Sequence, residues 1–313
     1  MSALAEPATF VPLSDGVISE NTLSAKAPWG PSASRAPPSA NCHHHPPAKP
    51  HDLPTTLAEV LPHTRFVFPN APRQRATVYK RSVMRQWFDD WHLRPELSGD
   101  VVDCRYDEGL QTSGLGDTVR YLHELIAKEA ALVGGVRNVV LGGMSQGCAA
   151  SLIAALLWEG DDRLGAVVGM CGWLPYLTQM QEAMHVREDS AGETSGKAED
   201  LEFFERSASP LASPTPAVTG KVDVAVSWLR DELEMPKYQG GEFSNARCKG
   251  IPIMLCHGRD DKKVDCYQSR AAADFLLSVG MEVRHWRLYN GVDHEFSGEM
   301  LADILAFLLT LPC

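Results

Sequence analysis

Ser145, in the segment Gly143-Met144-Ser145-Gln146-Gly147, is the residue best placed for nucleophilic chemistry. A short apolar run precedes this segment, and an Ala/Leu-rich stretch long enough for a helix follows it. A nucleophile elbow requires this strand–turn–helix context, because its tight turn needs glycines where a Cβ would collide with neighbouring backbone. Ser145 would then attack a carbonyl carbon, and the backbone N–H of Gln146 would point at the resulting oxyanion. The alternative interpretation is a glycine- and serine-rich loop after a strand.

A serine nucleophile also needs a base that takes its proton and an acid that orients the base. Where the serine lies on an elbow, the order along the chain is serine, acid, histidine. Two aspartates, Asp260 and Asp261, follow an apolar run that ends at Cys256, and His294 lies in a turn before the last helix. The order predicts His294 as the base and one of the two aspartates as the acid. The alternative for His294 is a turn histidine with a structural role.

The elements that would position these residues alternate along the chain. We expect strands over residues 65–69, 139–141, 166–170, 251–256 and 282–288, and helices over 57–61, 81–91, 115–132, 148–158, 222–233, 267–279 and 297–310, with Thr112 or Ser113 capping the third helix. Strands separated by helices predict an α/β fold with a mostly parallel central sheet and helices on both faces.

Composition limits the classes of function. The chain has 313 residues, of which 44% are hydrophobic, and a net charge of −11, which argues against a nucleic-acid binder. Eight cysteines are scattered without a CxxC pair, so we expect reduced, buried thiols in a cytoplasmic protein. Neither a signal peptide nor an apolar run long enough to span a bilayer is evident.

Changes in residue composition and apolar periodicity along the chain predict its domain organisation. Residues 1–51 are expected to be a disordered, proline-rich tail, and residues 52–313 one α/β domain. Residues 181–219 lose apolar periodicity and predict a mobile, solvent-exposed insertion. The three adjacent histidines at 43–45 cannot all face one ion in regular structure, so no metal site is expected there.

Several short motifs, taken in order, resemble the acyl-protein thioesterase / phospholipase–carboxylesterase family of α/β-hydrolases, and fungal-type members in particular. The matching stretches are Phe68-Pro69-Asn70-Ala71-Pro72, Trp87-Phe88-Asp89, Gly142-Gly143-Met144-Ser145-Gln146-Gly147, Gly172-Trp173-Leu174-Pro175, His257-Gly258-x-x-Asp261-x-x-Val264 and the turn at His294. The resemblance implies that Asp261, rather than Asp260, is the acid. It further implies that Trp173, Leu174 and Pro175 lie near an acyl-binding groove. His257 and Trp87 are expected to be structural.

The reaction implied by the resemblance is hydrolysis of an acyl thioester or ester through an acyl-enzyme, without a metal or an organic cofactor. The substrate would be an acylated protein or a small acyl ester, and transient contact with a membrane surface is compatible with such a substrate. The oligomeric state is not specified.

The chain departs from this family ahead of the Phe-Pro segment. Family members carry a strand there that ends in His-Gly-x-Gly and supplies a second oxyanion amide, whereas this chain has Cys42-His43-His44-His45-Pro46-Pro47 at a comparable distance. We expect a sheet with that central strand missing, or with its neighbours paired directly. Losing one oxyanion donor typically lowers the rate by about 10²–10³.

Three hypotheses follow from this departure. The chain is an active hydrolase in which another amide replaces the donor, or an impaired relative that only binds acyl chains. Alternatively, its first 50 residues come from a mis-assembled reading of the gene and do not represent the functional protein.

Overall fold

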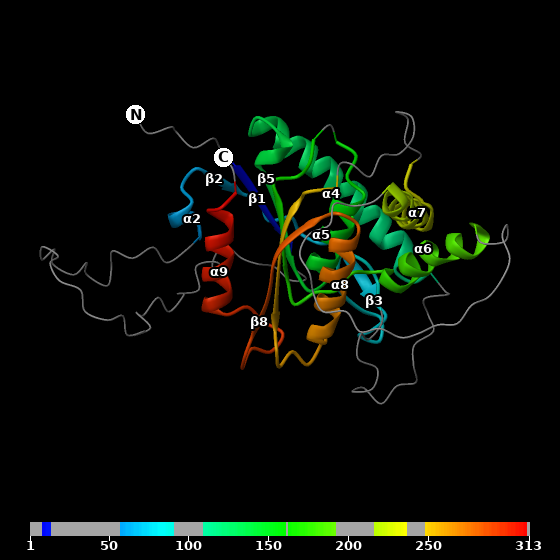
Figure 1. Ribbon diagram of the computed structural model, residues 1–313. Coiled ribbons are helices and arrows are strands. Elements are labelled where there is room, and N and C mark those ends of the chain that lie inside the picture. Colours follow the sequence, from blue (N-terminus) through cyan, green and yellow to red (C-terminus); the bar gives the residue numbers. More distant parts are fainter. Residues whose placement is uncertain are drawn as a thin grey trace, which may run out of the picture.

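A six-stranded parallel sheet forms the framework of the computed structural model, which describes residues 8–13, 57–90, 109–160, 162–191, 216–236 and 248–311 (Figure 1). The order across the sheet is β2-β1-β5-β6-β7-β8, and every neighbouring pair is parallel. The strands are β1 (Ala8–Leu13), β2 (Thr64–Phe66), β5 (Val139–Met144), β6 (Ala166–Met170), β7 (Pro252–Gly258) and β8 (Glu282–Tyr289). The expected parallel α/β sheet is therefore confirmed.

Strand β1 corrects the prediction of a missing central strand. It lies between β2 and β5, pairing Phe10 with Phe66 on one side and Leu13 with Gly143 on the other. The disordered tail predicted for residues 1–51 is accordingly wrong for residues 8–13. Local sequence opposed this strand, because Pro12 cannot donate a ladder hydrogen bond and the following region is rich in proline. The rest of the predicted tail, including the histidines at 43–45, lies outside the described residues.

Helices cover both faces of the sheet, as expected. They are α2 (Leu57–Val60), α4 (Thr112–Leu132), α5 (Gln146–Leu156), α6 (Leu177–Ala191), α7 (Pro216–Glu232), α8 (Cys266–Ser278) and α9 (Gly298–Leu308). In Figure 1, α9 lies on one side of the strands and α4, α5 and α8 lie on the other. Alternate strand residues supply the two cores: Val139 and Leu141 pack with α4 and α5, whereas Val140 packs with α9.

The segment predicted as a helix over residues 81–91 is a β-hairpin instead. Strand β3 (Arg73–Ala76) pairs antiparallel with β4 (Ser82–Arg85), and Lys80 and Arg81 adopt positive φ in the turn between them. Met84, Trp87 and Phe88 are spaced as on a helix, but pairing with β3 prevails over that local pattern. Trp87 is buried, which confirms its predicted core position.

Two helix boundaries also differ from expectation. Helix α6 continues to Ala191, so the first part of the predicted insertion is helical, and residues 192–215 lie outside the described residues. Helix α4 is preceded by Gln111 without a side-chain cap, so the predicted cap is wrong. The Thr112 hydroxyl hydrogen-bonds Tyr176 and Glu232 across the structure instead.

The described cysteines Cys148, Cys171, Cys248, Cys256 and Cys266 carry thiols rather than disulfides, and all but Cys266 are buried, as predicted. Within the described segments, no helix has both the length and the apolar character needed to cross a membrane.

Candidate active site

Ser145 occupies a sharp turn between β5 and α5. Its backbone lies at φ 55° and ψ −122°, a left-handed conformation that is unfavourable for a residue with a side chain. The turn is so tight that a Cβ on Gly143 would collide with the backbone carbonyl of Gly147. The Ser145 amide donates to the Met170 carbonyl of the neighbouring strand at 2.9 Å, which ties the turn to β6. The local structure is thus the elbow that the glycine spacing predicts.

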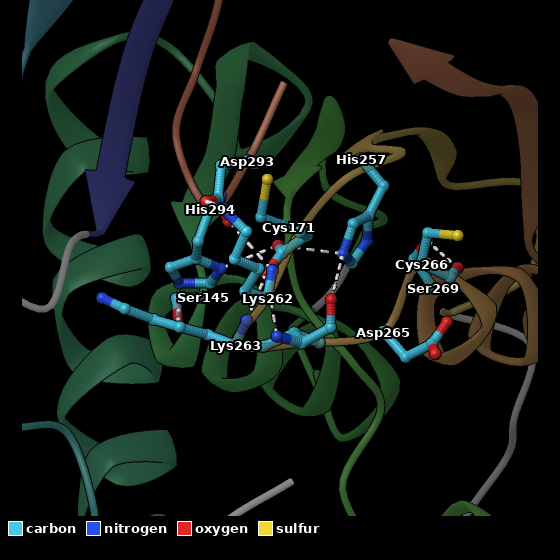
Figure 2. Close-up of polar contacts among 12 residues, drawn as sticks. Ser145, Cys171, His257, Lys262, Lys263, Asp265, Cys266, Ser269, Asp293 and His294 are labelled. Atoms are coloured by element: carbon cyan, nitrogen blue, oxygen red, sulfur yellow. Dashed lines mark hydrogen bonds and ion pairs between the residues drawn. The ribbon is translucent and has the colours of Figure 1, made fainter. Parts of the chain in front are cut away.

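Three residues from the ends of three strands form one hydrogen-bonded chain (Figure 2). His294 Nε2 lies 2.9 Å from Ser145 Oγ, and His294 Nδ1 lies 2.8 Å from Asp261 Oδ2. Ser145 follows β5, Asp261 follows β7 and His294 follows β8. Because the carboxyl ends of parallel strands share one edge of the sheet, residues 149 positions apart in sequence meet there.

Of the two neighbouring aspartates, Asp261 is the one in contact with the histidine. The Asp260 carboxylate accepts the Gly291 amide at 2.8 Å. Asp261 Oδ1 accepts the amides of Lys263 and Val264, at 2.8 and 2.9 Å. This arrangement leaves Asp261 Oδ2 for His294.

The Asp261 carboxylate is electrostatically suited to orient a histidine. Burial by itself would raise the pKa of this carboxyl, but hydrogen bonds from His257, His294 and the Val264 amide outweigh burial, and the pKa is held well below its usual range. Asp261 is therefore ionised at neutral pH. An ionised acceptor favours the His294 tautomer with hydrogen on Nδ1, which leaves Nε2 free to accept the Ser145 proton.

Hydrogen bonds also join the loop after β7, which carries Asp261, to the loop after β8, which carries His294. The Asp260 amide donates to the Val292 carbonyl at 3.0 Å, and Asp293 Oδ1 accepts the amides of Lys262 and His294, at 2.9 and 2.8 Å. The pKa of Asp293 is lowered by hydrogen bonds from the Lys262 amide and ammonium. Sequence reasoning missed this role of Asp293, since nothing local indicates that the two loops touch.

Gln146 makes contacts beyond those predicted for its backbone. Its side-chain Oε1 accepts the Trp87 amide and its Nε2 donates to the Phe88 carbonyl, both at 3.0 Å. Its own amide is the first of α5, and the first amides of a helix have no intrahelical acceptor. Gln146 thus offers an N–H at the elbow while its side chain joins the elbow to the segment after the hairpin.

The three residues expected near an acyl groove lie directly after β6. Trp173, Leu174 and Pro175 are all buried, and Trp173 packs edge-on against Phe88 with ring centroids 6.4 Å apart. Gly172 permits this packing, because a Cβ there would collide with Cys148. Their contact with an acyl chain stays a prediction.

Cys171, His257 and Asp261 present potential metal-ligand atoms within 4.8 Å of one another. Their chemistry fits hydrogen bonding better than metal binding. Burial raises the pKa of the Cys171 thiol to about 12, so this thiol is protonated at neutral pH. His257 Nε2 lies 3.1 Å from the Val264 carbonyl oxygen, so this nitrogen carries a hydrogen rather than a free lone pair.

Comparison with known sequences identifies a family. The family model described as Phospholipase/Carboxylesterase matches residues 51–191 and 236–311. Acyl-protein thioesterase 1 of Yarrowia lipolytica is 33% identical over 252 residues, which cover 80% of this chain and 79% of that protein. Carboxylesterase SOBER1 of Arabidopsis thaliana is 31% identical over 248 residues, covering 79% of this chain and 77% of that protein.

Solved structures agree on the fold. The crystal structure of SOBER1 superposes with a TM-score of 0.55 at 20% identity, covering 97% of this chain and 98% of the other. That of Zea mays acyl-protein thioesterase 2 gives a TM-score of 0.52 at 18% identity, covering 97% and 94%. At these identities the likeness shows a shared architecture.

Proposed function

We propose that this chain, which belongs to the phospholipase/carboxylesterase family, is a serine hydrolase that cleaves acyl thioesters or carboxylic esters. The observation that carries the proposal is the hydrogen-bonded chain from Ser145 through His294 to Asp261. The relatives named acyl-protein thioesterase and carboxylesterase support the same class of substrate, either an acylated protein or a small acyl ester. Its predicted cytoplasmic location stays a prediction.

In the proposed mechanism, His294 Nε2 takes the proton of Ser145 as Oγ attacks the acyl carbonyl carbon. Asp261 stabilises the imidazolium that forms. The tetrahedral intermediate collapses when His294 returns the proton to the departing thiol or alcohol, which leaves an acyl-serine. Water then repeats the sequence with His294 as base, and the products are a free carboxylic acid and the regenerated serine. Neither a metal nor an organic cofactor takes part in these steps.

The developing oxyanion needs backbone N–H donors, and the Gln146 amide is the first that we propose. The family resemblance implies a second donor after the strand beside the elbow, and β1 is that strand, ending at Leu13 opposite Gly143. The residues that follow are Ser14, Asp15 and Gly16, in place of the family's His-Gly-x-Gly, and they lie outside the described residues. The alternative function is therefore an impaired relative that only binds acyl chains, in a groove near Trp173, Leu174 and Pro175.

Labelling with a fluorophosphonate tests the nucleophile. We expect the wild type to be labelled and Ser145→Ala to be unreactive. Ser151→Ala is the matched control, because Ser151 lies on the same helix with its hydroxyl on the Gly147 carbonyl, and it should keep its labelling. Labelling that persists in Ser145→Ala would overturn the assignment.

Hydrolysis of short and long acyl thioesters and esters tests the alternative. Turnover that is lost in Ser145→Ala supports the hydrolase. A folded wild-type protein that binds a fluorescent fatty acid but neither reacts with fluorophosphonate nor turns over any of these substrates would support the impaired relative.

A further inference from the structure

A second histidine touches the carboxylate of Asp261. His257 lies near the end of β7 and is fully buried. Its Nε2 lies 3.2 Å from Asp261 Oδ2 and 3.1 Å from the Val264 carbonyl oxygen. His294 Nδ1 lies 2.8 Å from the same Asp261 Oδ2, so the two histidine rings labelled in Figure 2 approach one carboxylate oxygen.

The contacts of His257 determine its tautomer. Both groups beside Nε2 are acceptors, namely a carboxylate and a carbonyl, so the hydrogen belongs on Nε2 and is shared between them. The other nitrogen, Nδ1, is buried and has no hydrogen-bond partner among the described residues. A hydrogen on Nδ1 would be buried without an acceptor, which is unfavourable. The Nε2 hydrogen of His257 is thus directed at the Asp261 carboxylate and the Val264 carbonyl.

Asp261 is enclosed by donors on each of its oxygens. Oδ1 accepts two backbone amides, and Oδ2 accepts both histidines. The Cys171 thiol also interacts with the Asp261 side chain, and its sulfur lies 3.6 Å from the Glu295 carbonyl oxygen, which belongs to the histidine loop. A carboxylate with both oxygens bonded cannot rotate without losing contacts, so Oδ2 stays directed at His294.

We propose that His257 is a positioning residue for the reaction, which holds Oδ2 of Asp261 in line with His294 and shares its negative charge. This inference rests on the proposed hydrolase function. His257 does not contact Ser145 or the reacting atoms, and it acts through the carboxylate alone. Asp261 therefore contacts two histidines: His294, which serves as the base, and His257, which holds the carboxylate in place.

Loss of the His257 side chain has two consequences. The carboxylate gains freedom to turn, which lowers the fraction of molecules with His294 correctly oriented. The negative charge of Asp261, no longer shared with His257, also acts more strongly on His294, and this stabilises the imidazolium form of His294. The first effect lowers kcat. We expect a loss of about 10- to 100-fold, which is typical when the hydrogen-bond partner of a metal-ligating histidine is removed. The second moves the acidic limb of the kcat/KM profile to higher pH.

The experiment compares His257→Leu, His257→Gln and His257→Asn in the full chain. Leu removes the donor. Gln can place an N–H near the position of Nε2, whereas Asn is too short to reach Asp261. The matched control is His123→Leu, since the half-buried His123 places Nε2 on the Ala154 carbonyl oxygen at 2.8 Å and does not contact Asp261. Each variant is assayed for kcat, for the pH dependence of kcat/KM and for thermal unfolding.

We expect His257→Leu and His257→Asn to lose activity and shift the acidic limb upward, and His257→Gln to restore much of both. His123→Leu should lower the unfolding temperature without moving the limb. Wild-type kcat and an unmoved limb in folded His257→Asn would overturn the inference, and so would equal behaviour of Gln and Asn. If His257→Leu does not fold, the comparison of His257→Gln with His257→Asn tests the inference. Failure of the wild type to react with fluorophosphonate would instead contradict the proposed function itself.

Discussion

Replacing Asp261 with asparagine tests the proposed mechanism at its most specific point. In the wild type, Oδ1 faces two N–H donors and Oδ2 faces two histidine nitrogens. Asparagine would keep its carbonyl oxygen toward the amides of Lys263 and Val264, because an NH₂ group there would oppose two donors. The NH₂ group would consequently face His294 Nδ1.

That placement reverses the histidine tautomer. To accept a hydrogen bond from Asn, His294 Nδ1 must lose its hydrogen, and the hydrogen then lies on Nε2, opposite Ser145 Oγ. In this state Nε2 cannot take the serine proton. The same change in a Ser-His-Asp hydrolase lowers kcat by about 10⁴, equivalent to about 5.4 kcal/mol at 1.36 kcal/mol per tenfold change in rate. We expect a loss of this order for Asp261→Asn.

Asp260→Asn is the matched control for this experiment. Asp260 is adjacent in sequence, but its carboxylate accepts the Gly291 amide, and an asparagine oxygen can do the same. Its kcat should stay within about tenfold of the wild type, since a single neutral hydrogen bond contributes about 0.5–1.5 kcal/mol. Turnover of a chromogenic acyl ester measures both variants. A smaller loss in Asp261→Asn than in Asp260→Asn would refute the assignment of the acid.

Three further predictions concern the surroundings of the site. Asp293→Ala removes the acceptor shared by the Lys262 and His294 amides, and we expect kcat to fall by about 2- to 10-fold, whereas an unchanged kcat would show that the loops hold without it. Burial raises the pKa values of Cys171, Cys248 and Cys256 to about 12, so iodoacetamide at pH 8 should leave these thiols unmodified in the native protein and alkylate them after unfolding, as read by mass spectrometry. The folded state lowers the pKa of Asp261, so its contribution to stability is fully present above about pH 5 and is lost progressively as the pH falls below about 4; urea unfolding should show a weaker pH dependence below about pH 4 in Asp261→Asn, and an equal dependence would contradict this reasoning.

Features carried by contiguous residues could be predicted from the sequence. The elbow at Ser145 depends on glycines one turn apart, and the buried strands β5, β6 and β7 are runs of apolar residues with turn residues at their ends. The serine–acid–histidine order then limited the base to His294, because parallel strands bring their carboxyl ends to one edge. These inferences needed no knowledge of which strands are neighbours.

Strand β1 and the hairpin of β3 and β4 could not be predicted in this way. A six-residue segment containing Pro12 is a poor strand by local rules, and its partners in the sheet are residues 64–66 and 139–143. Helical spacing around Met84 was equally misleading, since β3 supplies the pairing. Tertiary pairing outweighs local preference here, because each strand gains hydrogen bonds only from its neighbours.

The sequence by itself predicted a nucleophile, its base and a choice of two acids, together with the parallel α/β architecture. Only the tertiary structure decided how those residues are held. His257 contacts Asp261, and Asp293 joins the loops after β7 and β8. The Gln146 side chain hydrogen-bonds the backbone of Trp87 and Phe88. Such contacts join side chains to loops that are distant in the chain. They depend on the register of neighbouring strands, which no local pattern of residue types specifies.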